Sequence, residues 1–529
     1  MIKTELILPY RYNDSMIRQA ISDRLPIGID EIRDVRIVRR ELVIEDGCIP
    51  RYKTSVAFSA DSLKERSLLN LKNKVRAYDA KVFSARPSFL DFRPVVVGAG
   101  PSGLFAALAL AESGAHPIVI ERGLSIDERG DRVKLFNTLG ILDTECNVQF
   151  GEGGAGTYSD GKLKVGVHDQ YKLRVLSEFV EAGADESILF SSSAHLGTDK
   201  LPDLVKAVRQ KAESLGAEFI FSAKLTAVNV KDGEVKSITY IKGGEETELP
   251  TRAVILAIGH SARDTIKMLK DTGLPMSAKG FGIGLRIEHP REHINRIVYK
   301  DAAPYVEETA SYHLVTHLDN GRSVYSFCMC PGGTVVAATS ENECIVTNGM
   351  SRYDRMGDNS NAALLVSVTP DDFASDDPLA GIELQRKIER GAYAISSEYR
   401  APSYNLSDFM DREACSTHHG VTPTYPLGAV IASPDEYLPD FVCESLRAAI
   451  PDFDAWLNGY AYADATLTGP ETRTTSPVRI ERNEGGEAHG FMGIYPTGEG
   501  AGYAGGIVSS AIDGIKNAEK LIGKYSQNN

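Results

Sequence analysis

The sequence predicts an α/β protein in which a nucleotide-binding domain is interrupted by a mixed α+β domain and preceded by a small α+β module. An apolar strand, a glycine turn and an alanine-rich helix follow one another from Pro94. Short strands and helices then mix, and the last segment returns to a strand, a glycine turn and a helix. A chain of 529 residues is also too long for one hydrophobic core. The predicted parts are residues 1–92 for the module, 93–270 and 476–529 for the nucleotide-binding domain, and 271–475 for the inserted domain.

The N-terminal module is predicted from alternating apolar residues and one helical pattern. The segments TELILPY, VRIVRREL and RYKTSVAFSA predict strands, and NDSMIRQAISDRL predicts a helix. Two prolines in SARPSFLDFRP indicate a linker to the next domain. The sequence points to no particular protein partner for this module.

A glycine turn after the strand VVV carries the main nucleotide-binding signal. Gly98, Gly100 and Gly103 have the spacing that permits a tight turn, close approach of the backbone to a pyrophosphate, and close packing of helix on strand. Pro101 suits the first helical position, where a missing N–H costs nothing, and Ser102 follows it. The N-terminus of this helix offers free N–H groups and a positive dipole end to an anion.

The second strand of this βαβ unit ends in an acid. Glu121 follows the turn by about twenty residues, where a carboxylate accepts hydrogen bonds from both hydroxyls of an adenosine ribose and disfavours a 2′-phosphate. Arg122 is expected in the same cofactor site. Arg129 and Arg132, in DERGDRV, either neutralise the pyrophosphate or are solvated helix charges.

A second glycine turn near the C-terminus favours FAD over NAD. In YPTGEGAGYAGGIV, Glu499 ends a strand where it can bind a ribityl hydroxyl. Gly505 and Gly506 open a helix whose N-terminal dipole would stabilise negative charge on the flavin. Gly259, Gly500 and Ile507 are also predicted in the cofactor site.

The motifs GAGPSGLFAALALAESG, VIERG, NVQFGEGGAGTYSDGKL, GLRIEHP, ETRTTSPVRI and YPTGEGAGYAGGI together carry a family resemblance. The chain from about residue 94 resembles the poorly characterised bacterial FAD-dependent dehydrogenases, within the wider glutathione-reductase-like superfamily of proteins with two dinucleotide-binding domains. The N-terminal module resembles that family's extra domain more weakly. The resemblance implies a Rossmann-like FAD-binding domain with an inserted mixed α+β substrate domain, and it implies no particular substrate.

The loop NVQFGEGGAGTYSDGKL follows no buried parallel strand and opens no apolar helix, so it is a poor second phosphate cradle. In related flavoproteins a glycine-rich loop in this place runs against the flavin ring, and the alternative is a flexible hinge. By that likeness the flavin contacts would be Gly153, Gly154, Gly156, Thr157, Ser159 and Asp160.

The leading hypothesis is an FAD-dependent dehydrogenase that acts on a small organic substrate between the two large domains. Glu152 and His418 are candidate acid–base groups, and Arg473 is a candidate clamp for a substrate carboxylate. One alternative is a flavin monooxygenase or reductase with NAD(P)H as transient electron donor, which the lack of a second complete NAD-binding unit disfavours. Another is a non-catalytic flavin-binding redox sensor or assembly protein, with the module as its partner-binding part.

Composition limits the other classes. The net charge of −14, from 58 basic and 72 acidic residues, repels phosphate backbones and anionic membranes, so neither nucleic acid nor a membrane is expected as partner. No signal peptide or spanning helix is predicted, which indicates a cytoplasmic protein.

Seven scattered cysteines predict no disulfide framework, and no metal site is predicted. Cys328 and Cys330 are expected to be packing residues on one strand face. Cys415, near His418 and His419, is either a metal or acid–base candidate or part of a polar loop. No histidine or cysteine falls in the flavin motifs, so FAD is expected to be non-covalent.

Overall fold

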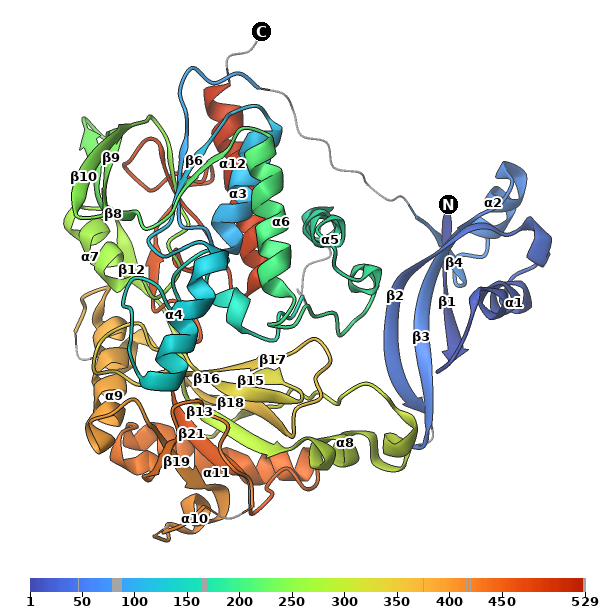
Figure 1. Cartoon of the computed structure of the whole chain (residues 1–529). Helices are drawn as coiled ribbons and strands as arrows, with labels where there is room; N and C mark the ends of the chain where they lie inside the picture. The colour runs from blue at the N-terminus through green and yellow to red at the C-terminus, as the bar shows by residue number, and fades with distance from the viewer. Residues whose placement is uncertain are drawn as a thin grey trace.

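A computed structural model describes residues 1–45, 47–78, 88–163, 170–373, 375–414, 416–418 and 420–526. A five-stranded parallel sheet with its helices forms one part, a seven-stranded sheet with its helices forms a second, and the N-terminal module lies beside both (Figure 1). None of the described helices is long and apolar enough to cross a membrane. The six cysteines within the described ranges are free thiols.

The N-terminal module has the βαββαβ topology of a ferredoxin-like fold, because its antiparallel sheet has the order β2-β3-β1-β4. Its helix α1 begins where the Asn13 side chain accepts a hydrogen bond from the Met16 N–H at 3.1 Å. Ile2, Val56 and Phe58 are fully buried in a separate apolar core. The elements are β1 Ile2–Pro9, α1 Asp14–Arg24, β2 Arg33–Glu45, β3 Ile49–Ser59, α2 Ser62–Leu69 and β4 Val75–Ala77.

The nucleotide-binding domain contains a parallel sheet of order β23-β11-β5-β6-β7, so the last strand of the chain pairs with β11, which lies much earlier in the sequence. Each strand has only three residues, and β5, β6 and β11 are buried throughout. These strands are β5 Val95–Val97, β6 Ile118–Ile120, β7 Glu218–Ile220, β11 Val254–Leu256 and β23 Ile494–Pro496.

Helices α3 and α12 pack side by side against this sheet (Figure 1). A three-stranded antiparallel sheet connects β7 to β11, and its hairpin turns at Asp232 and Gly233, both with positive φ. The helices are α3 Pro101–Glu112, α4 Ile126–Leu139, α5 Gln170–Glu181, α6 Leu201–Ser214, α7 Arg263–Asp271 and α12 Ile507–Tyr525. The additional strands are β8 Lys224–Lys231, β9 Glu234–Lys242 and β10 Glu245–Pro250.

The inserted domain is built on a sheet of order β14-β15-β18-β13-β21-β19-β20. Its central strand β13 is buried on both faces, because its apolar residues pack against helices of this domain and Arg286 on the other face packs against β17. The strands are β13 Phe281–Pro290, β14 Val315–His317, β15 Ser323–Cys330, β18 Asn359–Val368, β19 Ala401–Asn405, β20 Ala429–Ile431 and β21 Thr466–Glu471, with the separate pair β16 Gly333–Ala337 and β17 Thr347–Ser351. The helices are α8 Arg291–Tyr299, α9 Ala380–Ser396, α10 Leu406–Asp411 and α11 Asp440–Trp456.

The chain passes between the two large domains along one antiparallel pair. Strand β12 (Met276–Ala278) pairs with β22 (Val478–Ile480), so the outgoing and returning segments lie side by side. Short 3-10 helices complete the structure: η1 Ile29–Glu31, η2 Ala155–Tyr158, η3 Glu186–Leu189, η4 Lys300–Tyr305, η5 Pro370–Asp372 and η6 Pro434–Glu436.

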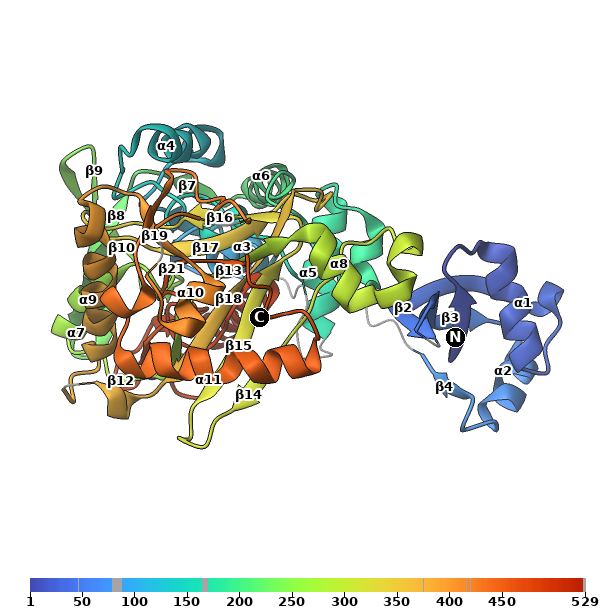
Figure 2. The same ribbon diagram turned by 90° about the horizontal axis from the view of Figure 1, so that it is seen from below.

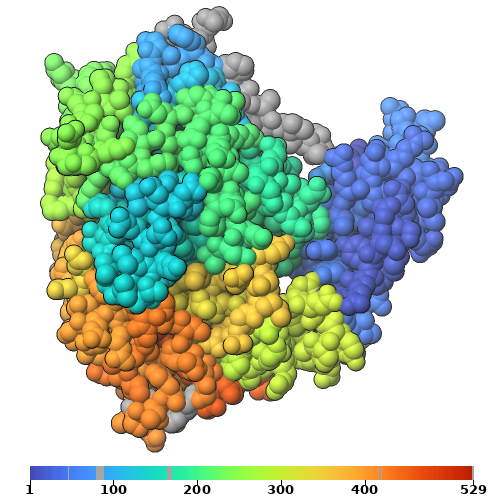
Figure 3. All heavy atoms as spheres, in the orientation of Figure 1, coloured from blue at the N-terminus to red at the C-terminus, as the bar shows by residue number. Residues whose placement is uncertain are grey.

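The module docks on the nucleotide-binding domain through the edge of β2. Arg40 donates its backbone N–H to the Phe190 carbonyl at 2.7 Å and accepts the N–H of Ser192 at 2.9 Å, which forms a short parallel bridge. The Arg40 guanidinium also lies 5.2 Å from the Phe190 ring centroid. The space-filling view places the blue module against green segments of the body at this boundary (Figure 3).

A second docking point reaches the inserted domain. The hydroxyls of Tyr10 and Tyr52 each donate to one carboxylate oxygen of Glu308, which follows η4. Burial and this hydrogen bond raise the pKa of Tyr10 to about 12, so its hydroxyl stays protonated and donates at neutral pH. Seen from below, the module lies next to the end of α8, from which η4 continues (Figure 2).

We expect Glu308→Ala to loosen this docking, because two tyrosine hydroxyls lose their acceptor at a cost of roughly 1–3 kcal/mol. Hydrogen exchange at the Ser192 amide, which donates to Arg40, should then accelerate severalfold. Glu307→Ala is the matched control, since its ion pair with Arg11 is largely exposed and contributes little. Equal exchange rates in the two variants would show that Glu308 does not hold the module in its docked position.

Candidate cofactor and substrate cavity

A cavity of about 780 Å³ lies between the nucleotide-binding domain and the inserted domain. One half is bounded by the turns that follow β5, β6, β11 and β23, at the carboxyl edge of the parallel sheet, where ligands bind in such folds. The other half, the inner chamber, is bounded by residues 159–162, 192–194, 311–313, 326–330 and 348–349, with Arg355 and Glu471. The volume is in the ~300–1,000 Å³ range of small-molecule sites.

The predicted cofactor residues divide into two groups by position. Those that line the cavity are Gly98, Gly100, Pro101, Ser102, Glu121, Arg122, Gly154, Gly156, Ser159, Asp160, Gly259, Glu499, Gly505, Gly506 and Ile507. Those that do not are Gly103, Arg129, Gly153, Thr157 and Gly500. In the second group Gly103 packs against the Gly98 carbonyl, where a Cβ atom would collide, as its place in the glycine spacing predicts.

The N-terminus of α3 is prepared to receive an anion. Gly98 has φ +97°, and a side chain there would collide with the Ala257 carbonyl. The N-cap of α3 is Gly100, which has no side chain to satisfy the first N–H groups of the helix. These N–H donors and the positive end of the dipole fit a pyrophosphate in the cavity.

Glu121 joins three backbone turns. Its carboxylate accepts the N–H of Ala99 at 2.8 Å and the N–H groups of Gly123 and Gly151 at 2.9 Å each. A carboxylate has about four acceptor positions, so this arrangement leaves about one for a ribose hydroxyl. The carboxylate that the sequence predicts as a ribose ligand therefore also fixes the backbone of the site.

Arg122 stands at the same end of the cavity and is held by acids. Its guanidinium pairs with Glu145 at 2.7 Å and Asp264 at 2.9 Å, and lies 4.1 Å from the Phe150 ring centroid. Lys224 pairs with the same two acids. Both cations are thus compensated within the protein.

The expectation that Arg129 either binds pyrophosphate or is solvated is wrong. Its guanidinium is fully buried and donates to backbone carbonyls on the glycine-rich loop. The acceptors are Asn147, Val148, Gly151, Glu152 and Gly154, at 2.6–3.3 Å. The loop has little regular structure, so these bonds replace the ones that a helix or sheet would supply. Arg132, by contrast, is half exposed.

Glu152 is also not an acid–base group of the cavity. It is fully buried, accepts the N–H of Ile126 at 2.8 Å at the start of α4, and pairs with Arg209 at 2.7 Å. His418 lies in the loop after α10 and is not among the residues that line the cavity. Its neighbours Cys415 and His419 lie outside the described residues.

Arg473 does line the cavity, but its charge is shared with a buried network. Its guanidinium donates to both carboxylate oxygens of Glu389 at 3.0 and 2.8 Å, and Arg263 binds the same carboxylate at 2.8 Å. Burial would raise the pKa of Glu389, but these two arginines outweigh it and hold that pKa well below its usual range. Glu341 pairs with Arg263 and Arg386.

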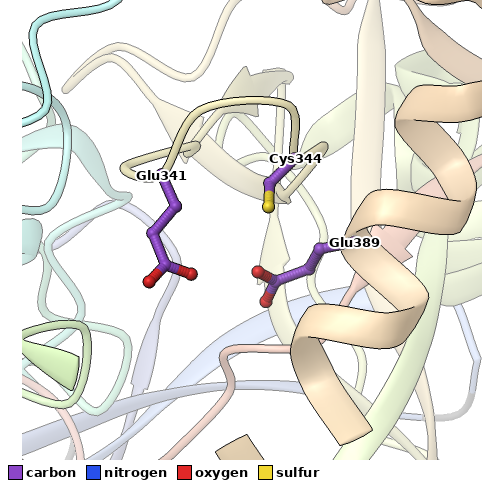
Figure 4. Close-up of side chains that lie close together, drawn as sticks. All are labelled: Glu341, Cys344 and Glu389. Atoms are coloured by element: carbon purple, nitrogen blue, oxygen red, sulfur yellow. The ribbon is translucent and has the colours of Figure 1, made fainter. Parts of the chain in front are cut away.

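Glu341, Cys344 and Glu389 place their ligand atoms within 4.8 Å of one another (Figure 4). The two carboxylates already accept hydrogen bonds from arginines, and burial raises the pKa of the Cys344 thiol to about 11. A cation there would have to displace guanidinium groups. The chemistry of the cluster is therefore that of an ion-pair network.

The C-terminal turn brings a second uncapped helix to the cavity. The N-cap of α12 is Gly506, with φ +88° and no side-chain cap. Burial raises the pKa of Glu499 to about 7, and the Gly506 N–H and Lys279 offset it only partly. Burial, followed by the charges of Arg473 and Arg263, lowers the pKa of His260 to about 3, so this histidine is neutral.

Sequence reasoning missed several residues of the inner chamber. Arg355 has φ +54° and binds both carboxylate oxygens of Asp160, although the two residues are far apart in sequence. Cys328 is exposed rather than packed, because a bulge in β15 gives it φ +40°. Only Lys162 had a local signal, as the last charge of the SDGKL motif.

Comparison with known families identifies both large parts of the chain. Residues 91–267 match the family described as FAD binding domain, and residues 280–474 match the family described as FAD-dependent protein, C-terminal domain-like. An uncharacterised protein of Clostridium beijerinckii is 48% identical over 522 residues, which cover 97% of this chain and 96% of that protein. These matches do not extend to the glutathione-reductase-like superfamily.

The solved structures to which this chain is similar are distant from it. A 3-ketosteroid dehydrogenase from Rhodococcus jostii has 14% identity and TM-score 0.36, with 84% of this chain and 100% of that chain covered. The flavin-dependent brominase Bmp2 has 12% identity and TM-score 0.38, with 82% and 80% covered. A geranylgeranyl bacteriochlorophyll reductase-like protein from Thermoplasma acidophilum has 11% identity and TM-score 0.36, with 82% and 80% covered. Similarities this low do not indicate a reaction.

We expect Arg129→Met to destabilise the nucleotide-binding domain by at least roughly 3 kcal/mol, because several buried carbonyls lose their donor. Thermal unfolding followed by near-UV circular dichroism measures the effect. Arg132→Met on the same helix should change the free energy of unfolding by under about 0.5 kcal/mol. Similar melting temperatures for the two variants would show that Arg129 does not hold the loop.

Proposed function

The chain belongs to the family of FAD-dependent proteins that its two domain matches and its Clostridium relative define, and from this we propose that it is a dehydrogenase of a small organic substrate. Its cofactor is FAD, and its reaction is an oxidation–reduction. The proposal adds that FAD is held non-covalently and that the substrate occupies the inner chamber.

The donors around the cavity fit FAD at both ends. The uncapped N-terminus of α3 at Gly100 would hold the pyrophosphate, and the remaining acceptor position on Glu121 would take a ribose hydroxyl. The uncapped N-terminus of α12 at Gly506 would lie against the flavin. No Cβ atom narrows the cavity at Gly505 or Gly506, where nothing lies within 4 Å of the Cβ position.

The observation that carries the proposal is that one cavity joins this nucleotide site to the inner chamber. FAD supplies the two-electron chemistry when bound. The chain contributes the enclosure, which is lined by β15 and β17 of the inserted domain and by the loop of residues 159–162. Substrate and cofactor would thereby be held together with little water.

Protons can be managed at Glu499. With a pKa of about 7, this carboxyl is protonated below pH 7 and ionised above it, so it can hold or release a proton near neutrality. His260, with a pKa of about 3, remains neutral across this range and can donate or accept a hydrogen bond. Arg263, Arg386 and Arg473 are balanced by Glu341, Glu383 and Glu389, so this network brings no net charge to the cavity.

The electron donor is tested by adding NADH or NADPH to the purified protein without oxygen and following the visible flavin absorbance. A dehydrogenase that draws electrons from its own substrate keeps its yellow colour, while dithionite bleaches it as a positive control. Rapid bleaching by either nucleotide would contradict the proposal and identify a nicotinamide-driven reductase or monooxygenase.

Glu499→Gln should remove one pH-dependent step from the midpoint potential of the bound FAD. Above pH 7 the ionised Glu499 opposes the negative charge that FAD gains on reduction, so the wild-type potential falls more steeply there. A coupling of one pKa unit corresponds to about 1.4 kcal/mol, or about 30 mV for two electrons. The midpoint potentials of the wild type and of Glu499→Gln are measured against redox dyes from pH 6 to 8. If Glu499 does not face the flavin, the two proteins will show the same slope of potential against pH.

A further inference from the structure

The charged groups of the inner chamber are paired, with one exception. Asp160 pairs with Arg355, and Glu471 pairs with the buried Arg286 behind it. The remaining cation is Lys162. Within the described ranges, no carboxylate lies within 4.0 Å of the Lys162 ammonium, which donates only to the carbonyl of Met329.

The position of Lys162 is fixed by its backbone. Lys162 forms an antiparallel bridge with His195, and the next residue, Leu163, donates its N–H to the Ala194 carbonyl at 3.0 Å. The side chain is only partly exposed and lines the cavity. An ammonium group has three donors, so about two remain for a ligand.

The neighbouring thiols do not neutralise this charge. Although Cys328 is exposed to the cavity, desolvation of its thiol there raises its pKa to about 12 despite the opposing effect of Lys162, so the thiol is uncharged at neutral pH. Burial likewise raises the pKa of Cys330. A partly buried ammonium without a counter-ion is unfavourable, and its free energy falls when an anion enters.

The second lysine of the cavity provides the contrast. Lys224 lies at the opposite end and pairs with Glu145 at 3.0 Å and with Asp264 at 2.6 Å. The two lysines thus share a cavity but not an electrostatic state. Of these two lysines, Lys162 is the one whose charge has no carboxylate partner among the described residues and whose donors can reach a ligand.

We propose that Lys162 is the anchor for a carboxylate on the substrate, so that the substrate class is a small organic acid. This inference rests on the proposed function and specifies the substrate of the same site. The carboxylate would bind the ammonium inside the chamber, next to the exposed Cys328 and Asn348. The rest of the acid would extend toward the flavin end of the cavity.

Binding to the FAD-loaded protein tests this without turnover. Benzoate, acetate and succinate are titrated while the flavin difference spectrum is recorded, with benzamide as the uncharged counterpart of benzoate, all at one ionic strength. We expect benzoate to bind wild type about tenfold to a hundredfold more tightly than benzamide. Lys162→Met should abolish this preference, and Lys162→Arg should retain most of it.

Lys224→Met is the matched control and should leave the benzoate preference unchanged. Flavin content and melting temperature are measured for each variant, so that a misfolded protein is recognised. If Lys162→Met is misfolded, Lys162→Arg is the variant that tests the proposal. The proposal is wrong if no carboxylate changes the flavin spectrum of the wild type. It is also wrong if Lys162→Met keeps the preference for benzoate over benzamide, or if Lys162→Met changes only the midpoint potential of the flavin. Absence of any bound flavin would instead refute the proposed function.

Discussion

The structure depends on satisfying the backbone of a long loop that has almost no helix or sheet. Residues 147–162 run between the two large domains, where buried carbonyl and N–H groups without partners would be costly. Arg129 and Glu121 supply part of these partners, and the rest come from the loop itself and from neighbouring segments. Arg129 donates to carbonyl groups of the loop, among them those of Gly151 and Glu152, and the carboxylate of Glu121 accepts the N–H of Gly151. The cavity exists because these two residues hold the loop open beside α3.

The nucleotide-binding fold could be predicted because its signals are local. Gly103 is required by a contact within one βαβ unit, Gly98 has a positive φ in the turn of that unit, and Glu121 follows at a distance set by the length of the unit. The strands and helix of the N-terminal module follow from short periodic patterns in the same way. The order β23-β11-β5 could not be read from sequence, because Val254 pairs with Val95, 159 residues before it, and with Ile494, 240 residues after it.

The site could be predicted only in part, because charge alone does not tell a ligand contact from an internal one. Glu152, Arg129 and Arg473 have residue types suited to catalysis or anion binding, but each is engaged by partners distant in sequence. Lys162 differs from these three residues. It lies in the SDGKL motif and has no carboxylate partner among the described residues. Whether a charged side chain is held internally or is available to a ligand depends on the residues that pair with it in the folded structure.

The N-terminal module contacts both large domains close to the cavity. It binds Ser192 through Arg40 and binds Glu308 through two tyrosines. The segments that wall the inner chamber, residues 192–194 and 311–313, begin at or within three residues of these contacts. The module therefore braces one wall from each large domain, and a change in its docking would be transmitted to the chamber through very few bonds.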